Sequence, residues 1–360
     1  MTKKIKIGSI YIGGGEKIAV QSMCNIKTEK ADEVISQIKA LEALGCDIIR
    51  VSVKDQADAK AIRKIKDRIN IPLVADIHFD YKLAIAALEN GADKIRINPG
   101  NIGLEGGVKA VADALKAHKA ACRVGSNSGS VEKSFLQKYG KNEISLAESA
   151  LEKAALLEKY GFYDIVISAK SSSVATTVKT YRYLSEKTGY PLHVGVTEAG
   201  TLQSGIIKGS AGIGALLLDG IGDTVRYSLS APPEEEVKAG VKLLRAVGLD
   251  KNYAEVIACP TCGRTAYDCM GLAAATEDYV ANVKKPLKIA VMGCVVNGPG
   301  EAADCDLGIA GNGEECVIFK FGKPFKKVAA TNAKEEFFKE IDLICGKNAK
   351  IKGKTNERIY

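Results

Sequence analysis

The sequence predicts an α/β protein: a (β/α)8 TIM barrel followed by a small α+β domain. Residues 18 to about 247 alternate short runs rich in β-branched residues with amphipathic segments, and there are eight such runs. The alternation then stops, and seven of the ten cysteines follow residue 250. We therefore expect a barrel domain over residues 1–250 and a second domain over residues 251–360.

The predicted strands and helices follow one another in the order that a barrel requires. Segments such as ADEVISQIKALEALG and SLAESALEKAALLEKYG carry apolar residues at three- and four-residue spacing and end in glycine, as helices do. Pro232 and Pro233, followed by three glutamates, predict the start of the last barrel helix. The eight predicted strands are IAVQSM, DIIRVSV, PLVADIHF, KIRINPG, CRVGSNSG, DIVISAK, PLHVGVTEAG and DTVRYSL.

An open, doubly wound sheet would show the same alternation. Its glycine-rich nucleotide fingerprint would follow the first strand, whereas IGGGEK precedes that strand here. We interpret these glycines as a tight turn in an N-terminal hairpin.

The second domain is predicted to mix strands and helices around a cysteine turn. After that turn come a helix over TAYDCMGLAAATEDYVANV, the strand KIAVMGCVV, the turn NGPGE, two strands near DLGIAG and ECVIFKFG, and a last helix. We interpret the basic tail KNAKIKGKTNERIY as a solvated end of the chain.

Composition narrows the classes of partner. The net charge is +8, but basic and acidic residues are interleaved, and the chain has no Trp and only 6% aromatic residues. This composition argues against a nucleic-acid partner and favours a small anionic molecule or an acidic protein. The chain has no apolar run of the roughly 18 residues that a membrane helix needs, and its start lacks a secretory signal, so we expect a cytoplasmic protein.

Five cations are predicted at the carboxyl ends of barrel strands, where barrel active sites are built. Their neighbours along the strands, such as Ile95 and Ile97, are apolar, so the cations should point into the barrel. Buried cations need anionic partners, and a phosphate or diphosphate ester would supply them. The alternative is a set of ion pairs with carboxylates such as Asp47, Asp76 or Asp164. The five cations are Arg50, Arg96, Arg123, Arg226 and Lys170.

The cysteines indicate a metal or redox site in the second domain. Cys259 and Cys262 form a CxxC turn, a spacing shared by zinc ribbons and iron-sulfur sites. All three histidines precede residue 250, so a third ligand should be a distant cysteine, and Cys294, at the end of a predicted strand, is the first candidate. For the fourth position, ligand type favours Cys305 and then Cys269, while Glu301 would be a weaker, more easily displaced ligand. Otherwise we expect Cys269, Cys316 and Cys345 to be buried hydrophobes.

Two long motifs identify a family resemblance. CPTCGRTAYD (Cys259 to Asp268) and AVMGCVVNGPGEAADCDLGIAG (Ala290 to Gly311) resemble the signature of the 4-hydroxy-3-methylbut-2-enyl diphosphate synthase family, iron-sulfur enzymes of the non-mevalonate isoprenoid pathway. The similarity covers nearly the whole chain and resembles the bacterial two-domain form. It continues through IGGGEKIAVQSM, VADIHFD, IRINPGN, RVGSNSGS, LHVGVTEAG and GIGDTVRYSLS.

The resemblance implies an oxidoreductase. The expected reaction is the reductive ring opening of 2-C-methyl-D-erythritol 2,4-cyclodiphosphate to hydroxymethylbutenyl diphosphate, with two electrons delivered through a 4Fe-4S cluster. Reduced flavodoxin or ferredoxin is the expected electron donor, and the family's homodimer is the expected assembly. The resemblance also implies Glu198 as catalytic acid or base and assigns the metal ligands Cys259, Cys262, Cys294 and Glu301. The implied substrate-binding residues are Arg50, Arg96, Arg123, Asn127, Lys170, Arg226 and Ser228.

Two positions depart from the family pattern. Cys24 stands in QSMCN where the family usually has threonine, and Cys305 stands near the cluster loop where a small residue is more usual. Cys305 is therefore a rival fourth ligand. Two other readings remain at this point: a zinc-knuckle protein that binds nucleic acid, and a plain iron-sulfur electron carrier.

Overall fold

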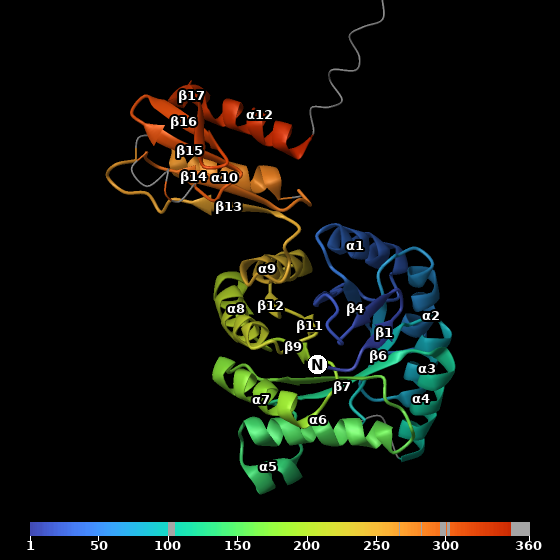
Figure 1. The fold of residues 1–360 in the computed structure, drawn as a ribbon. Coiled ribbons are helices and arrows are strands. Elements are labelled where there is room, and N and C mark those ends of the chain that lie inside the picture. Colours follow the sequence, from blue (N-terminus) through green and yellow to red (C-terminus); the bar gives the residue numbers. More distant parts are fainter. Residues whose placement is uncertain (100–104, 266, 282, 296–299, 301–302, 347–360) are drawn as a thin grey trace, which may run out of the picture. The chain divides into compact units, whose positions relative to one another are not determined.

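The chain divides into two compact units, Met1–Leu249 and Asp250–Tyr360. The structure is a computed structural model that describes residues 1–99, 105–265, 267–281, 283–295, 300 and 303–346 (Figure 1).

The first unit is a closed barrel of eight strands, as predicted. All paired neighbours are parallel, and the strand order is β8-β7-β6-β5-β4-β3-β11-β9. A bridge between Ile167 and Leu192 joins the two ends of this order and closes the ring. The strands are β3 (Ala19–Met23), β4 (Ile48–Ser52), β5 (Leu73–Asp76), β6 (Lys94–Arg96), β7 (Ala121–Asn127), β8 (Ile165–Lys170), β9 (His193–Val194) and β11 (Thr224–Val225).

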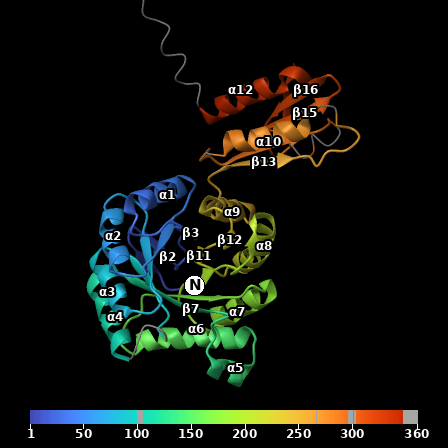
Figure 2. The same cartoon turned by 180° about the vertical axis from the view of Figure 1, so that it is seen from behind.

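Helices surround the barrel on its outer side (Figures 1 and 2). Their starts are fixed by local capping: Asp55 caps α2, and Asn142 forms a capping box with Ser145 at the start of α6. The helices of this unit are α1 (Ala31–Ala43), α2 (Gln56–Lys66), α3 (Tyr81–Glu89), α4 (Glu105–His118), α5 (Lys133–Tyr139), α6 (Glu143–Glu158), α7 (Val174–Lys187), α8 (Leu202–Leu218) and α9 (Pro233–Ala246).

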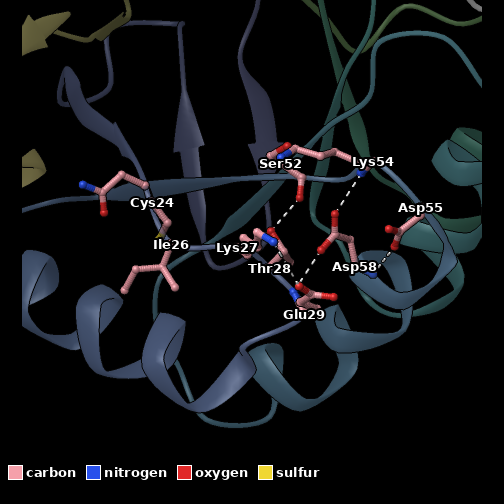
Figure 3. Close-up of a pocket in the computed structure, with 10 residues that line it drawn as sticks. Cys24, Ile26, Lys27, Thr28, Glu29, Ser52, Lys54, Asp55 and Asp58 are labelled. Atoms are coloured by element: carbon pink, nitrogen blue, oxygen red, sulfur yellow. Dashed lines mark hydrogen bonds and ion pairs between the residues drawn. The ribbon is translucent and has the colours of Figure 1, made fainter.

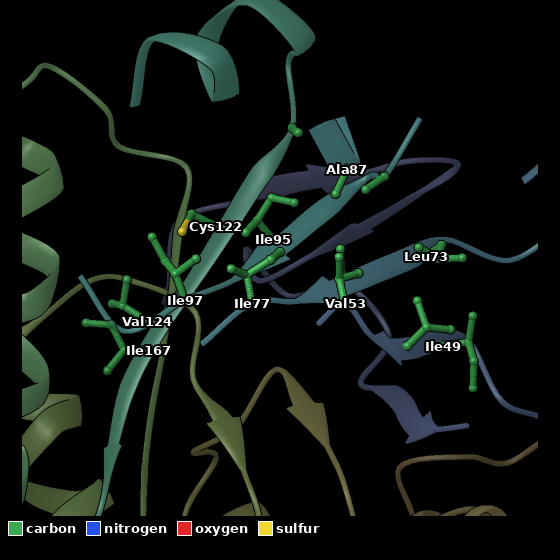
Figure 4. Packing of buried hydrophobic residues seen from close by; sticks show 14 of the residues in the cluster. Ile49, Val53, Leu73, Ile77, Ala87, Ile95, Ile97, Cys122, Val124 and Ile167 are labelled. Atoms are coloured by element: carbon green, nitrogen blue, oxygen red, sulfur yellow. The ribbon is translucent and has the colours of Figure 1, made fainter. Parts of the chain in front are cut away.

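Alternation along each strand separates the core from the site. In β6, Ile95 is fully buried in the core cluster between strands and helices, and so is Ile97 just beyond the strand end (Figure 4). Lys94 and Arg96 alternate with them and therefore point the other way, into the barrel. The core is therefore built from one set of strand positions, and the other set is free to carry polar groups.

An N-terminal hairpin fills the amino end of the barrel. It consists of β1 (Ile5–Ile7) and β2 (Ile10–Ile12), whose isoleucines pack in one cluster with inward residues such as Ile48, Val74 and Val166. The predicted hairpin exists, but the turn between its strands is Gly8–Ser9, so the placement of the turn at the triple glycine was wrong. Gly13, Gly14 and Gly15 follow β2, and all three have positive φ.

Two short segments extend the carboxyl end of the barrel. β10 (Gly200–Thr201) and β12 (Leu229–Ser230) form a separate parallel pair beyond β9 and β11. This pair links two of the loops that carry predicted site residues.

The second unit contains a five-stranded sheet in the order β13-β14-β15-β16-β17. Its first three strands are parallel and the last two are antiparallel to their neighbours. The sequence analysis missed β13 and β17, and it began the first helix too early. Asp268 is the N-cap of α10, which begins at Cys269, and its carboxylate accepts a hydrogen bond from the Gly271 N–H. The elements are β13 (Ala254–Ala258), α10 (Cys269–Val280), β14 (Leu287–Met292), β15 (Leu307–Asn312), β16 (Glu315–Lys320), β17 (Lys323–Ala329), the short helix η1 (Ala330–Asn332) and α12 (Ala333–Cys345). Within the described residues, no helix is both long and apolar enough to cross a membrane.

Candidate active site

The five predicted cations gather at the carboxyl ends of β4, β6, β7, β8 and β11. Arg50, Arg123 and Lys170 are buried, at 9%, 4% and 7% exposure, and Arg96 and Arg226 are half-buried. Burial first, and then the positive charges of Arg226, Arg123 and Arg96, lower the pKa of Arg50 well below its ordinary value, although the Asp76 carboxylate opposes this shift. That direction reflects the cost of crowding like charges in a protein interior.

Two carboxylates neutralise part of this charge. Asp76 Oδ1 lies 3.0 Å from Nη1 of Arg96, and Asp76 Oδ2 lies 3.8 Å from Nε of Arg50. The predicted alternative of ion pairs with core carboxylates is therefore correct for Asp76, which pairs with two of the cations. Asp47 and Asp164 instead pair with Lys17 and Lys3.

The second carboxylate, Glu236, was not predicted as a site residue. Its Oε2 lies 3.3 Å from Nε of Arg226, and it also accepts hydrogen bonds from the Leu229 N–H and the Ser22 hydroxyl. The sequence analysis interpreted Glu236 only as part of an acidic first turn of α9. Glu236 is the third glutamate of that turn, and its side chain points toward the end of β11.

The side chains of Arg123 and Lys170 have no hydrogen bond or ion pair with any residue that the structure describes. Burial first, and then neighbouring cations, lower the pKa of Lys170 well below 10.5. Gly195 makes room for this side chain, because a Cβ there would lie 2.7 Å from Lys170 Nζ. Within the described barrel, five cations thus face two carboxylates, and the excess positive charge needs an anion.

Glu198 lies in the loop between β9 and β10, in a strained backbone conformation. Its φ is +50°, a left-handed value that is rare outside glycine, and its side chain is exposed. The next residue donates a backbone hydrogen bond of 3.4 Å from Ala199 N to Ser228 O, which ties the loop to the predicted binding residue Ser228. Asn127 ends β7 and is exposed.

A pocket of about 200 Å³ lies between the loops that follow β3 and β4 (Figure 3). Its polar groups bond one another: Asp58 accepts from the N–H groups of Glu29 and Lys54, and Thr28 donates to the Ser52 carbonyl. Cys24 lines this pocket, and burial raises the pKa of its thiol to about 12. This pocket contains none of the five cations, and Cys24 is a buried, protonated thiol there.

A second group of polar residues is buried in the barrel, and the sequence analysis missed Lys94 among them. Lys94 is fully buried in the barrel, and its Nζ lies 3.5 Å from Gln21 Oε1. His193 is also fully buried and shares a 2.8 Å hydrogen bond between Nδ1 and Thr224 Oγ1. Lys94 is the first residue of β6. Only the closed ring of strands shows that a side chain at this position faces the inside of the barrel.

The cysteines of the second unit lie at one edge of its sheet. Cys259 directly follows β13 and donates its N–H to the Val291 carbonyl of β14 at 2.9 Å. Cys294 lies two residues beyond the end of β14, and the two strands are parallel neighbours. Cys262 is exposed, and Thr261 before it has a left-handed φ of +64°. The structure thus brings Cys259 and Cys294 to the same edge, with Cys262 three residues away.

The donor set fits an iron-sulfur cluster in residue type. Two half-buried cysteines and one exposed cysteine are the thiol donors that such clusters prefer. Across the described residues no three His, Cys, Asp or Glu side chains converge closely enough to hold a metal ion. The predicted fourth ligand, Glu301, lies outside the described residues.

Tyr267 supports the strand end that precedes Cys294. Its hydroxyl donates to the Met292 carbonyl at 3.0 Å, and burial raises its pKa, so the proton stays available for this bond. Its ring occupies space that Gly311 leaves open, because a Cβ there would lie 2.5 Å from the ring. Tyr267 therefore fixes the end of β14.

The other cysteines of this unit are mostly packed as hydrophobes. Cys305 is 3% exposed and clusters with Met292, Ala310 and Phe319, and burial raises its pKa. Cys269 and Cys316 are buried as predicted, whereas Cys345 is only half-buried.

Two family models match the chain. The GcpE TIM-barrel domain covers residues 2–241, and the GcpE protein C-terminal domain covers residues 255–343. A protein of Caldanaerobacter subterraneus subsp. tengcongensis named 4-hydroxy-3-methylbut-2-en-1-yl diphosphate synthase (flavodoxin) is 56% identical over 343 residues, which is 95% of this chain and 97% of that protein. A protein of the same name from Clostridium perfringens is 52% identical over 95% of this chain and 99% of its own length.

Two solved structures resemble about two thirds of the chain. Dihydropteroate synthase from Yersinia pestis superposes with a TM-score of 0.51 at 12% identity, over 69% of this chain and 98% of that chain. The dihydropteroate synthase of Stenotrophomonas maltophilia gives 0.51 at 14% identity, over 68% and 97%. At such low identity the likeness establishes the fold alone.

Proposed function

Because the chain belongs to the GcpE family, we propose that it catalyses the reductive opening of 2-C-methyl-D-erythritol 2,4-cyclodiphosphate to 4-hydroxy-3-methylbut-2-enyl diphosphate. Its relatives at 56% and 52% identity carry the name of that activity. The observation that carries the proposal is the pair of buried, unpartnered cations, Arg123 and Lys170, inside a barrel with excess positive charge.

The cations would bind the diphosphate in two ways. Arg123 and Lys170 have no competing partner among the described residues, so they are available to phosphate oxygens at once. Arg50, Arg96 and Arg226 are held by Asp76 and Glu236, which orient their guanidinium groups before the substrate arrives. Asn127 and Ser228, at the rim, would donate further hydrogen bonds to the same oxygens.

Glu198 would move the proton that the ring opening requires. The reaction consumes two electrons and two protons. The bond from carbon to the ring oxygen breaks and this oxygen stays on the diphosphate, while a hydroxyl of the carbon chain leaves as water. The exposed carboxylate of Glu198, on a loop tied to Ser228, would give a proton to that leaving hydroxyl. Its left-handed φ is consistent with a residue held in a strained conformation for a functional reason.

Cys259, Cys262 and Cys294 would hold the 4Fe-4S cluster, with Glu301 as the fourth ligand. When bound, the cluster supplies the electrons one at a time. The support from this chain is the placement of Cys259 and Cys294 at the ends of two parallel strands and the exposure of Cys262. Burial of Cys305 in an apolar cluster favours Glu301 over that thiol.

We also propose the remaining properties of the assembly. The donor would be reduced flavodoxin or ferredoxin, since the named relatives use flavodoxin. The enzyme would act in the cytoplasm as a homodimer.

Turnover of the cyclic diphosphate by protein purified without oxygen, with chemically reduced flavodoxin, tests the activity. We expect about four irons and four sulfides per chain and formation of the linear diphosphate. Arg123→Met should remove cyclic diphosphate binding, whereas Arg182→Met, which removes an exposed arginine paired with Asp219, should not. Full cluster content with no consumption of the cyclic diphosphate would contradict the proposal.

A further inference from the structure

A layer of buried polar side chains lies beneath the cations. Gln21, Lys94 and His193 are each at most 1% exposed. Gln21 and Lys94 lie two residues before the last residues of β3 and β6, and His193 is the first residue of β9. Lys94 Nζ is 3.5 Å from Gln21 Oε1, while Gln21 Nε2 and His193 Nε2 are buried without a hydrogen-bond partner among the described residues. Burying polar groups without hydrogen-bond partners costs free energy, so this layer points to a function.

No carboxylate balances Lys94. The charged groups that act on it are Arg123 from β7 and Arg50 from β4, and Cys122 of β7 contributes weakly from the strand's outer side. His193 of β9 lies under the influence of Lys170, Arg123, Lys94 and Arg50. The two carboxylates nearest this region are already committed, Asp76 to Arg50 and Arg96, and Glu236 to Arg226.

The free barrel therefore disfavours a proton on Lys94. Burial first, and then the charges of Arg123 and Arg50, lower its pKa to about 7. Burial and the same cations hold the pKa of His193 well below 6.5, so this ring stays neutral. At pH 8 the amine of Lys94 is mostly unprotonated, although the layer directly above it is cationic.

A bound diphosphate reverses this balance. Its negative charges cancel the field of Arg123 and Arg50 at Lys94 and add an attraction of their own. A protonated amine beneath the anion then gains a counter-charge that nothing else in the layer supplies.

We propose that Lys94 takes up a proton from solvent when a diphosphate binds above it, so that the barrel presents one more positive charge to bound ligand than it carries when free. Lys94 is on this account a positioning residue that acts through Arg123 and Arg50. The inference rests on the proposed function for the identity of the ligand, but its physical content requires only a diphosphate.

Calorimetry of binding in two buffers with different ionisation enthalpies measures the protons taken up. The probes are inorganic pyrophosphate and the cyclic diphosphate, added at pH 8 to the full-length protein with its cluster. Wild type should take up protons with both ligands, and Lys94→Met should take up fewer by up to about one per site. Lys238→Met is the matched control, since it removes an exposed lysine that pairs with Glu235, and it should match wild type.

The pH dependence of affinity provides a second readout. A site whose proton affinity rises on binding loses ligand affinity as pH rises above the pKa of the free group. Between pH 7.5 and 9 the Kd for pyrophosphate should therefore rise more steeply with pH in wild type than in Lys94→Met. The difference in slope should be at most about tenfold in Kd per pH unit. Lys170, whose pKa is also lowered, contributes equally to both proteins.

Each outcome decides the inference. An unchanged proton count in Lys94→Met, or no proton uptake by wild type, overturns it, and the wild-type measurement stands even if the variant fails to fold. Lys94→Gln offers a second folded variant. Pyrophosphate binding with a Lys94-dependent proton, without binding of the cyclic diphosphate, supports this inference and contradicts the proposed function.

Discussion

Asp76 Oδ1 accepts a hydrogen bond of 3.0 Å from Nη1 of Arg96, and the other oxygen of the same carboxylate lies 3.8 Å from Nε of Arg50. One buried carboxylate thus orients two of the cations that the sequence analysis expected to bind phosphate. Burial alone would raise the pKa of Asp76, but Arg50, His78 and Arg96 pull it well below its ordinary value. The carboxylate is therefore charged at any pH at which the enzyme works.

Asp76→Asn should destabilise the barrel and make its stability depend on bound anions. Removing one partner of a buried ion pair leaves uncompensated cations, at a cost of about 3 kcal/mol. Denaturation with and without pyrophosphate would measure this, and pyrophosphate should stabilise the variant more than wild type. Asp32→Asn is the control, because Asp32 makes comparable ion pairs at an exposed position and should cost less than about 1 kcal/mol. Equal losses in the two variants would argue against a special role for Asp76.

Glu198→Gln should lower kcat by about 100-fold to 10,000-fold and change KM little, because in the proposed mechanism the carboxylate protonates the leaving hydroxyl and does not bind the phosphates. Glu198→Gly distinguishes the effect of backbone strain at this position from the effect of losing the carboxylate. Glycine adopts a φ of +50° without strain, so this variant should be at least as stable as wild type and equally inactive. Steady-state kinetics and thermal unfolding would give the two quantities. Activity in Glu198→Gln near that of wild type would remove Glu198 from the mechanism.

Cys305→Ala should keep both the cluster and the activity, with a loss of about 1 kcal/mol in stability from the smaller side chain. Cys305 packs among Met292, Ala310 and Phe319, and its thiol is protonated because burial raises its pKa. Cys259→Ala is the contrasting variant and should lose iron and sulfide. Iron and sulfide analysis on protein prepared without oxygen checks both, and loss of the cluster in Cys305→Ala would contradict the assignment of Glu301 as fourth ligand.

Lys94 should make the stability of the barrel depend on pH. Its pKa is lowered to about 7 from 10.5, so between these values the unfolded chain binds a proton that the folded chain does not. Wild-type stability should therefore rise with pH in that window, by about 1 kcal/mol per unit relative to Lys94→Met. Urea unfolding of both proteins at pH 7.5 and 9, followed by circular dichroism, would give the difference. A constant difference between the two pH values would show that Lys94 is charged in the folded barrel.

The strands were predictable because barrel strands leave a local signal. The alternation of Lys94, Ile95, Arg96 and Ile97 is visible in four consecutive letters, and it separates the inward from the outward positions. The same alternation predicted the positions of all five cations at the strand ends. It did not say which of them would be neutralised, because the partner of Arg226 comes from a helix that begins seven residues later.

The residues that the sequence analysis missed lie in sequence patterns that are equally typical of an exposed structural residue and of a buried site residue. Glu236 sits in the first turn of α9, where glutamates are expected for helix stability alone, so nothing in the sequence distinguishes the one that turns inward. Lys94 follows an aspartate at the start of a strand, a place where a solvated lysine is ordinary. The strand β13 was overlooked because AEVIA is short, and its pairing with β14 connects segments 33 residues apart at both ends.

The hairpin that fills the amino end of the barrel ties the beginning of the chain to its latest strands. Thr2 Oγ1 donates to Asp223 Oδ1 at 2.6 Å, across 221 residues, and Lys3 N donates to the Gly189 carbonyl at 2.7 Å. Thr2 and Lys3 therefore reach these partners only after nearly the whole first unit has been synthesised. Until then the apolar isoleucines of the hairpin have no complete surface to pack against, which makes sealing of the barrel a late, long-range event in folding.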